Sequence, residues 1–308
     1  MSTAKIVVVG SVNTDMVVKS ERIPGPGETV TGGTFFMPAG GKGANQAVAA
    51  ARLGAQVTLV AKVGDDMFGR QAIENFQKEG ILTDHIALDS ENATGVALIL
   101  VDEAGENCIS VAPGANFAIT PADVDAAADA IRNADVVLLQ LEIPMTVVEH
   151  TAALAAEAGA PVVLDPAPAA PLPEGLLPNV AVLTPNESEA ERLTGIAVED
   201  EGSARQAAAA LLEAGARQVI ITLGTKGALV IGPEIDTLVP SFEVKAADST
   251  AAGDAFNGGL AAALGSGDTL EDAVRQAAMV GALSVTKMGA QPSLPTAEEL
   301  QQFAQENA

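Results

Sequence analysis

Residues 247–259 (ADSTAAGDAFNGG) combine small side chains with a carboxylate at the predicted start of a helix. The segment follows a strand-like stretch, and its small residues would leave the unpaired N–H groups of the first helical turn open to a ligand. Such donors suit the negative charge of a phosphoryl group during transfer. Asp254 lies in the same turn, where it could accept a proton from an attacking hydroxyl. The alternative is that Asp254 only caps the helix.

Two glycines follow in the same predicted helix, Gly258 and Gly259. Each costs about 1 kcal/mol relative to alanine inside a helix. Their presence therefore predicts very close packing of this helix against another stretch of backbone.

The elements that position this turn are predicted from the pattern of apolar residues. Short β-branched stretches alternate with Ala- and Leu-rich helical stretches, which is typical of an α/β fold with a mostly parallel sheet between helices. The predicted strands are 5–10, 57–63, 135–139, 161–165, 180–184, 218–223, 228–231 and 236–239, and the main predicted helices are 43–53, 67–79, 146–158, 203–214 and those that begin at 252 and 270. We expect one domain over residues 1–308.

Two segments, about 14–37 and 91–114, interrupt this alternation. The first contains a Pro-Gly-Pro-Gly turn at 24–27 followed by a predicted strand at 28–31, and the second is predicted to be a β-hairpin around Gly105. A sheet this small cannot bury both of its faces. We therefore expect a lid on the main domain that dimerises with the lid of a second copy.

Composition excludes several classes of protein. The chain has 40 Asp and Glu residues against 16 Lys and Arg, a net charge of −24, which disfavours nucleic acid and anionic membranes as partners. No signal-peptide core or membrane-length apolar stretch is present, so a cytoplasmic protein is expected. A single cysteine, Cys108, rules out a disulfide framework and is expected to be a packing residue.

Two nucleotide-binding patterns are also missing. No G-x-G-x-x-G motif follows the first strand, which argues against a dehydrogenase, and the glycines at 40–43 do not have the spacing of a P-loop.

The motifs together resemble the ribokinase, or pfkB, family of carbohydrate and nucleoside kinases. The 247–259 segment resembles the family's C-terminal signature, and residues 40–47 (GGKGANQA) resemble its N-terminal signature. Between them, in family order, lie 184–189 (TPNESE) and 222–227 (TLGTKG), so the resemblance spans nearly the whole chain. The stretch 10–15 (GSVNTD) resembles the ribose-phosphorylating members more than the fructose or nucleoside kinases.

The resemblance implies a role for each matching residue. Asp254 would be the catalytic base, and the amides of Ala251, Ala252 and Gly253 would form an anion hole. The sugar would be bound by Asn13, Asp15, Gly41, Lys42, Asn45 and Glu142, together with Asp254. Without the family, Asn13 and Asp15 would be turn residues, Lys42 a surface charge and Glu142 an acid at a helix entry.

The resemblance also implies sites for ATP and for metal ions. ATP would contact Asn186, Thr222, Gly224, Thr225, Lys226, Gly227, Gly253 and Ala278. Asn186 and Glu189 match an Asn-x-x-Glu element that is linked to Mg²⁺, although the same spacing fits a helix-capping box. A monovalent cation, K⁺ in related enzymes, would lie near Asp248, Thr250, Ser284, Lys287, Gly289 and Ser293. Because the chain lacks Trp and Tyr, an adenine pocket would be lined by aliphatic side chains or Phe, and Ala278 replaces a histidine found in some relatives.

The resulting expectation is a kinase of D-ribose catabolism that transfers the γ-phosphoryl group of ATP to O5 of D-ribose. The alternatives are a family kinase that acts on 2-deoxyribose, fructose or a nucleoside, and a non-catalytic sugar or nucleotide sensor on the same fold. The presence of Asp254 argues against the sensor, which would have no need of a base.

Overall fold

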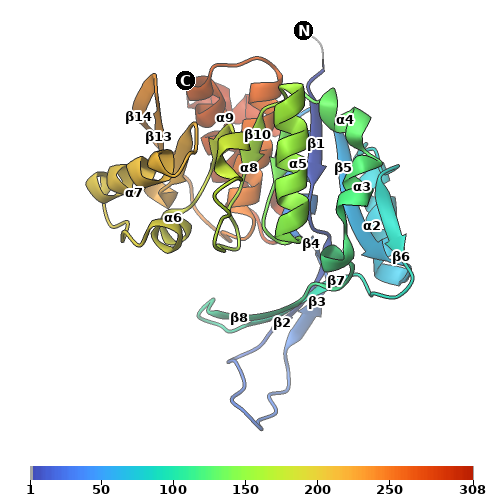
Figure 1. Cartoon of the computed structure of the whole chain (residues 1–308). Coiled ribbons are helices and arrows are strands. Elements are labelled where there is room, and N and C mark those ends of the chain that lie inside the picture. Colours follow the sequence, from blue (N-terminus) through green and yellow to red (C-terminus); the bar gives the residue numbers. More distant parts are fainter. Residues whose placement is uncertain (1–2, 308) are drawn as a thin grey trace.

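The computed structural model describes residues 3–307, and its largest element is a nine-stranded sheet (Figure 1). Seven of its strands run parallel in the order β12-β11-β10-β9-β1-β5-β6. Beyond β12, the strands β13 and β14 pair antiparallel and form one edge of the sheet. The strands are β1 (Lys5–Val9), β5 (Gln56–Gly64), β6 (Ile86–Asp89), β9 (Val136–Leu139), β10 (Val162–Leu164), β11 (Val182–Leu183), β12 (Val219–Thr222), β13 (Ala228–Gly232) and β14 (Ile235–Val239).

Helices cover both faces of this sheet, because its central strands are apolar on both sides. In β1, for example, Ile6 and Val8 join one core while Val7 and Val9 join the other. The first core is covered by α1 (Lys42–Arg52), α2 (Met67–Lys78), α8 (Ala252–Gly265), α9 (Leu270–Ser284) and α10 (Ala297–Glu306). The second is covered by α3 (Pro121–Asp125), α4 (Ala128–Arg132), α5 (Met145–Ala158), α6 (Glu187–Thr194) and α7 (Glu201–Glu213).

A second, smaller sheet projects from the main body (Figure 1). It contains β2 (Asn13–Lys19), β3 (Thr34–Phe36), β4 (Ala39–Gly40), β7 (Gly95–Val101) and β8 (Asn107–Ala112). The strands β2 and β7 run parallel, while β3, β4 and β8 pair antiparallel with their neighbours. Apolar side chains remain exposed on this sheet and next to it, namely Phe35, Phe36, Met37, Leu98, Ile109, Val111 and Phe117.

Most predicted elements are present with ends displaced by a few residues, including the hairpin around Gly105. Two predictions were wrong. Residues 28–31 are not a strand, since pairing with β2 begins only at Thr34, after the turn has ended. Cys108 is exposed, because β8 is the edge strand of the small sheet and nothing packs on it. Within residues 3–307, no helix has the length and apolar character needed to cross a membrane.

Candidate active site

The predicted site residues gather where the parallel strands of the main sheet end. The segment after β1 leads to Asn13, the segment after β9 contains Gln140 and Glu142, Asp165 follows β10, and Asn186 follows β11. The carboxyl ends of parallel strands are the usual position of ligand sites in open α/β sheets. The small sheet leaves the main domain at the same edge through β2.

Asp254 lies in the first turn of α8 and is only 4% exposed. Its Oδ2 accepts a hydrogen bond from Asn45 Nδ2 at 2.8 Å, and its Oδ1 accepts one from Gln46 Nε2 at 3.2 Å. Burial raises the pKa of the Asp254 carboxyl, while the Lys42 charge and the two amide donors act to lower it. A buried carboxylate with these partners is suited to act as a base rather than as a helix cap.

The turn before α8 has an uncommon backbone. Ala251 adopts a left-handed conformation with φ 60°, and such strain at a non-glycine residue is concentrated at functional sites. The N–H of Ala252 donates to the Ser249 carbonyl at 3.2 Å, so this member of the predicted anion hole already has a partner. Among the residues described, the N–H groups of Ala251 and Gly253 make no hydrogen bond. They remain available to an anion.

A cavity of about 240 Å³ lies beside the predicted sugar-binding residues Asn13 and Glu142. Glu142 Oε2 accepts hydrogen bonds from Ser11 Oγ at 2.5 Å and from the backbone N–H of Lys42 at 3.0 Å. Asn13 is also oriented, because its Oδ1 accepts from Asn116 Nδ2 at 2.8 Å. The polar groups of this cavity are therefore held in place before any ligand arrives.

Gly40 and Gly41 allow the chain to pass closely against β2, the strand that carries Asn13 and Asp15. A Cβ on Gly40 would overlap the carboxylate of Asp15. Gly41 has φ 91°, and a Cβ there would lie 2.7 Å from the backbone nitrogen of Asn13. Burial and, to a smaller extent, the neighbouring charges of Glu142 and Asp254 together raise the pKa of Asp15 to about 6.

Lys42 is the cation of this otherwise acidic group. Burial alone would lower the pKa of its ammonium, but the surrounding charges of Asp254, Asp165 and Glu142 raise it overall. Asn45, on the same helix, has a buried Oδ1 without a hydrogen-bond partner. Such an acceptor is costly unless a ligand hydroxyl donates to it.

A larger cavity of about 780 Å³ is lined by Ala252 and Gly253 of the α8 turn. Seven of the residues predicted to bind nucleotide line it: Asn186, Thr222, Gly224, Thr225, Gly227, Gly253 and Ala278. Phe242, Phe256 and Val285 add an apolar wall, which matches the expectation of a pocket built from aliphatic side chains and Phe. The turn from β12 to β13 needs glycine, since Gly224 and Gly227 have φ 55° and 106°.

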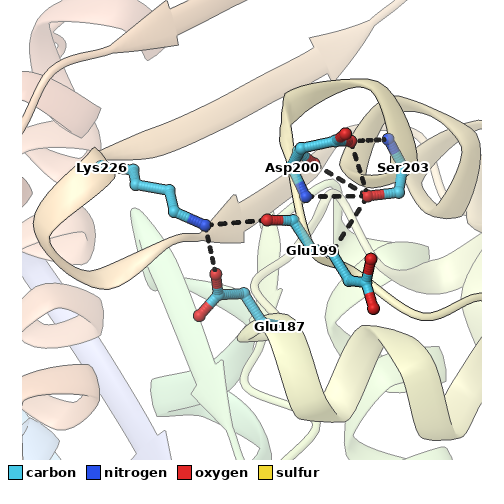
Figure 2. Close-up of polar contacts among 5 residues, drawn as sticks. All are labelled: Glu187, Glu199, Asp200, Ser203 and Lys226. Carbon is cyan, nitrogen blue, oxygen red and sulfur yellow. Dashed lines mark hydrogen bonds and ion pairs between the residues drawn. The ribbon is translucent and has the colours of Figure 1, made fainter.

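Lys226 does not point into this cavity. Its Nζ donates to the Glu199 carbonyl at 3.0 Å and lies 3.5 Å from Glu187 Oε1 (Figure 2). Beside it, Asp200 and Ser203 form the capping box at the start of α7. Lys226 thus connects the β12–β13 turn to the start of α6 and to the segment just before α7, and its side chain faces these segments rather than the larger cavity.

The residues linked to metal binding form two groups. Asn186 and Glu189 make the capping box of α6, so the structural alternative for this motif is realised. Around Asp248, Oδ1 accepts from Thr250 and Oδ2 accepts from the N–H of Gly289 at 2.8 Å. The backbone also joins Ala247 to Val285. These bonds bring residues 248–250 together with the segment 284–293, which contains the predicted cation-site residues Ser284, Lys287, Gly289 and Ser293. The Lys287 side chain itself forms an ion pair with Glu299.

Sequence reasoning missed five buried polar residues of the site: Ser11, Gln46, Asn116, Gln140 and Asp165. Gln46 and Ser11 lie within the recognised motifs, so their position was a usable signal. Asn116, Gln140 and Asp165 lie outside any motif, and their side chains contact residues 103, 94 and 119 positions away. Burial raises the pKa of Asp165 to about 8.

Comparison with known proteins agrees with this geometry. A family model described as "pfkB family carbohydrate kinase" matches residues 3–297. The chain is 44% identical to a ribokinase of Haemophilus influenzae over 97% of each chain, and 37% identical to a deoxyribokinase of Salmonella typhi over 97% of this chain and 98% of that one. It superposes on a structure of Arabidopsis thaliana ribokinase complexed with ribose and ATP with a TM-score of 0.93, at 34% identity and with 98% and 99% of the two chains covered.

The family model spans almost the whole chain, residues of the N-terminal signature bond the buried Asp254 carboxylate, and residues of the other signatures line the larger cavity. This protein belongs to the pfkB family of carbohydrate kinases.

Proposed function

We propose that this protein transfers the γ-phosphoryl group of ATP to O5 of D-ribose, giving D-ribose 5-phosphate. The observation that carries the proposal is the position of Asp254. This buried carboxylate is bonded to Asn45, next to the sugar-binding residues, and it directly follows Gly253, which lines the larger cavity. The names and close similarity of the relatives support ribose and ATP as substrates.

Ribose would occupy the smaller cavity, with its hydroxyl groups bound by Asn13, Asp15, Asn45 and Glu142. Carboxylates and amides can each take paired hydrogen bonds from vicinal hydroxyls. The unpaired Oδ1 of Asn45 is one acceptor already in place. The Lys42 ammonium would balance the carboxylates and donate to the sugar.

In the reaction, Asp254 removes the O5 proton as O5 attacks the γ-phosphorus and the bond to the ADP oxygen breaks. The free N–H groups of the α8 turn stabilise the negative charge on the transferring group. The proton ends on Asp254, and ADP leaves through the larger cavity. Exclusion of water by the small sheet would limit idle hydrolysis of ATP.

Mg²⁺ is the expected partner of the ATP phosphates. Mg²⁺ usually keeps several waters and takes only one or two protein carboxylates, so a modest protein site is sufficient. Glu189 fits this requirement, since the capping box engages its Oε2 and leaves Oε1 without a hydrogen bond among the described residues. The ion would neutralise phosphate charge, and Asn186, which lines the cavity, would help to orient the phosphates.

A monovalent cation such as K⁺ would bind near Asp248. The Asp248 carboxyl has a pKa lowered by hydrogen bonds from Thr250 and Gly289, which outweigh its burial, so it stays anionic. Among the described residues it has no ion-pair partner. An anionic Asp248 carboxylate that has no ion-pair partner among the described residues, at the place where residues 248–250 meet residues 284–293, is suited to bind a monovalent cation.

We further propose that the small sheet, within a single domain of residues 1–308, acts as a lid and as the surface through which two copies associate. Ile109 is 53% exposed, and Phe35, Phe36, Leu98 and Val111 of the same sheet are exposed to similar extents. Burial of such a surface favours association. Use of ATP as donor would place the enzyme in the cytoplasm, and the net charge of −24 argues against nucleic-acid and membrane partners.

The test is an assay of ADP release over D-ribose, 2-deoxyribose, fructose and adenosine, for the wild type and for Asp254→Asn. We expect D-ribose to have the highest kcat/KM. The variant should lose roughly 10²–10⁴-fold in kcat, as expected for removal of a general base, while ribose still binds. Near-normal turnover by Asp254→Asn would remove the residue from its role.

The second candidate acceptor is 2-deoxyribose, since a relative named deoxyribokinase is 37% identical over nearly the whole chain. A higher kcat/KM for 2-deoxyribose than for ribose in the same assay would favour it.

A further inference from the structure

Gln46 is completely buried and lies between two carboxylates. It is on α1, and its Nε2 donates to Asp165 Oδ2 at 2.9 Å and to Asp254 Oδ1 at 3.2 Å. Both hydrogens of its amide nitrogen are therefore used. Its Oε1 accepts a hydrogen bond from Gln140 Nε2 at 2.7 Å. The side chain has no unused polar atom.

The orientation of the Gln46 amide follows from its partners. Turning the amide over would place its oxygen against two carboxyl groups and its nitrogen against the NH₂ of Gln140, which cannot accept a hydrogen bond. Gln140 is fully buried, its Oε1 lies where a side chain on Gly10 would be and has no hydrogen-bond partner among the described residues, and the bond to Gln46 is the hydrogen bond that holds its side chain. The chain of bonds thus runs in one direction, from Gln140 through Gln46 to the two acids.

Asp254 is the residue of this hydrogen-bond network that takes part in the proposed reaction. Each of its carboxylate oxygens receives one amide donor, from Gln46 on Oδ1 and from Asn45 on Oδ2. Two donors from successive residues of one helix prevent rotation of the carboxylate plane. Both donors also favour the ionised form, which is the form that can accept a proton.

We propose that Gln46, held by Gln140, is a positioning residue that orients the Asp254 carboxylate and keeps it ionised for the reaction. The proposal rests on the function proposed above, in which Asp254 is the base. Gln46 does not need to touch either substrate, since all of its polar atoms are engaged within the protein.

The charged groups around Asp254 enter any pH dependence. They are Lys42 on α1, Asp15 on β2, Glu142 after β9, Asp165 after β10 and Glu189 on α6. Replacement of Gln46 by an uncharged residue removes none of these charged groups, although it takes away the hydrogen bond to Asp165 as well as the one to Asp254. A change in the pH profile of such a variant therefore reports on the lost hydrogen bonds and not on the removal of a charged residue.

The experiment compares Gln46→Met and Gln140→Met with the wild type. Methionine keeps the length of the side chain but cannot donate. For Gln46→Met we expect kcat to fall roughly 10- to 100-fold, as for loss of a hydrogen bond to a charged group, with much smaller changes in the KM values for ribose and ATP. The acid limb of the kcat profile should move to higher pH by about one unit or more.

Gln140→Met should shift kcat and the acid limb in the same direction but by less, because it acts one bond further from Asp254. This variant decides the matter if Gln46→Met does not fold. The matched control is Gln71→Met, which removes an exposed hydrogen bond to Asn75 on α2 and should leave kinetics unchanged. Thermal unfolding is measured for all variants.

A purely structural role would lower the unfolding temperature and leave kcat and its pH profile at wild-type values, and that result would overturn the proposal. Failure of the proposed function is distinguishable. If Asp254→Asn stays active, the base assignment falls; if Asp254→Asn is inactive while Gln46→Met and Gln140→Met behave as wild type, only the positioning role falls.

Discussion

Replacement of Gly258 by alanine tests whether the contact between α1 and α8 sets the geometry of the catalytic turn. Gly258 is one helical turn after Asp254, and it faces α1. A Cβ there would lie 2.8 Å from the Gln46 carbonyl oxygen and 3.1 Å from the Ala50 nitrogen, and it would overlap the Ala49 methyl. Two of these three atoms are backbone, so they cannot rotate away.

The magnitude follows from these distances. Ordinary contacts of carbon atoms are about 3.5–4 Å, so the two helices must separate by roughly 1 Å. Overpacking of this kind costs about 1–3 kcal/mol, offset by about 1 kcal/mol from the better helix propensity of alanine. We expect a net loss of up to about 2 kcal/mol, and a fall in the unfolding temperature of up to roughly 6 °C.

The effect on activity should exceed the effect on stability. The displaced helix α1 carries Asn45 and Gln46, which hold Asp254, and a misplacement of about 1 Å can cost on the order of 10²-fold in rate. The assay measures kcat well below the unfolding temperature. The matched control is Gly202→Ala in α7, where the nearest atom to the new Cβ is Asp200 Oδ1 at 3.4 Å. This control should keep full activity and equal or slightly greater stability. A Gly258→Ala variant with wild-type kcat and raised stability would refute the reasoning.

Three further predictions concern other parts of the site. The pKa of Asp15 is raised to about 6, and its ionised form would accept hydrogen bonds from the sugar. The KM for ribose should therefore rise as pH falls through about 6, while the KM for ATP should not. A ribose KM that stays constant between pH 7.5 and 5 would contradict this. Lys226→Met removes a half-exposed ion pair with Glu187 and a hydrogen bond to the Glu199 carbonyl. Because such pairs contribute little, the KM for ATP should rise less than about fivefold at unchanged kcat. A rise well above tenfold would show that Lys226 reaches the bound nucleotide. The exposed apolar side chains of the small sheet predict a dimer in light scattering, and Ile109→Glu should convert it to monomer; a monomeric wild type at assay concentration would count against the lid interface.

Much of the fold could be predicted because its signals are local. The strands of the main sheet are apolar on both faces, and the helices between them have glycine at their ends, as at Gly159 after α5. The strand at 28–31 was predicted wrongly because strand formation there depends on pairing, and β2 finds its partner at Thr34–Phe36 instead. Cys108 was misplaced because one sequence does not say which strand lies at the edge of a sheet.

Some of the site was also readable from the sequence. The small residues around Asp254 indicated an anion-binding helix start, and Gly258 indicated the close packing that the structure places against α1. The roles of Asn13, Asp15 and Glu142 required the family resemblance, since each is an ordinary turn or helix-entry residue by itself.

The sequence by itself determined the order of strands and helices, the acidic surface and the chemical groups available to the site, because these depend on side-chain types and short spacings. Only the tertiary structure decided that Gln140, Asp165 and Asp254 meet at Gln46 from positions 94 to 208 residues away, and that Lys226 turns toward Glu187. The physical reason is that a hydrogen bond between distant residues is set by how the strands and helices pack, and no local pattern in the chain records that packing.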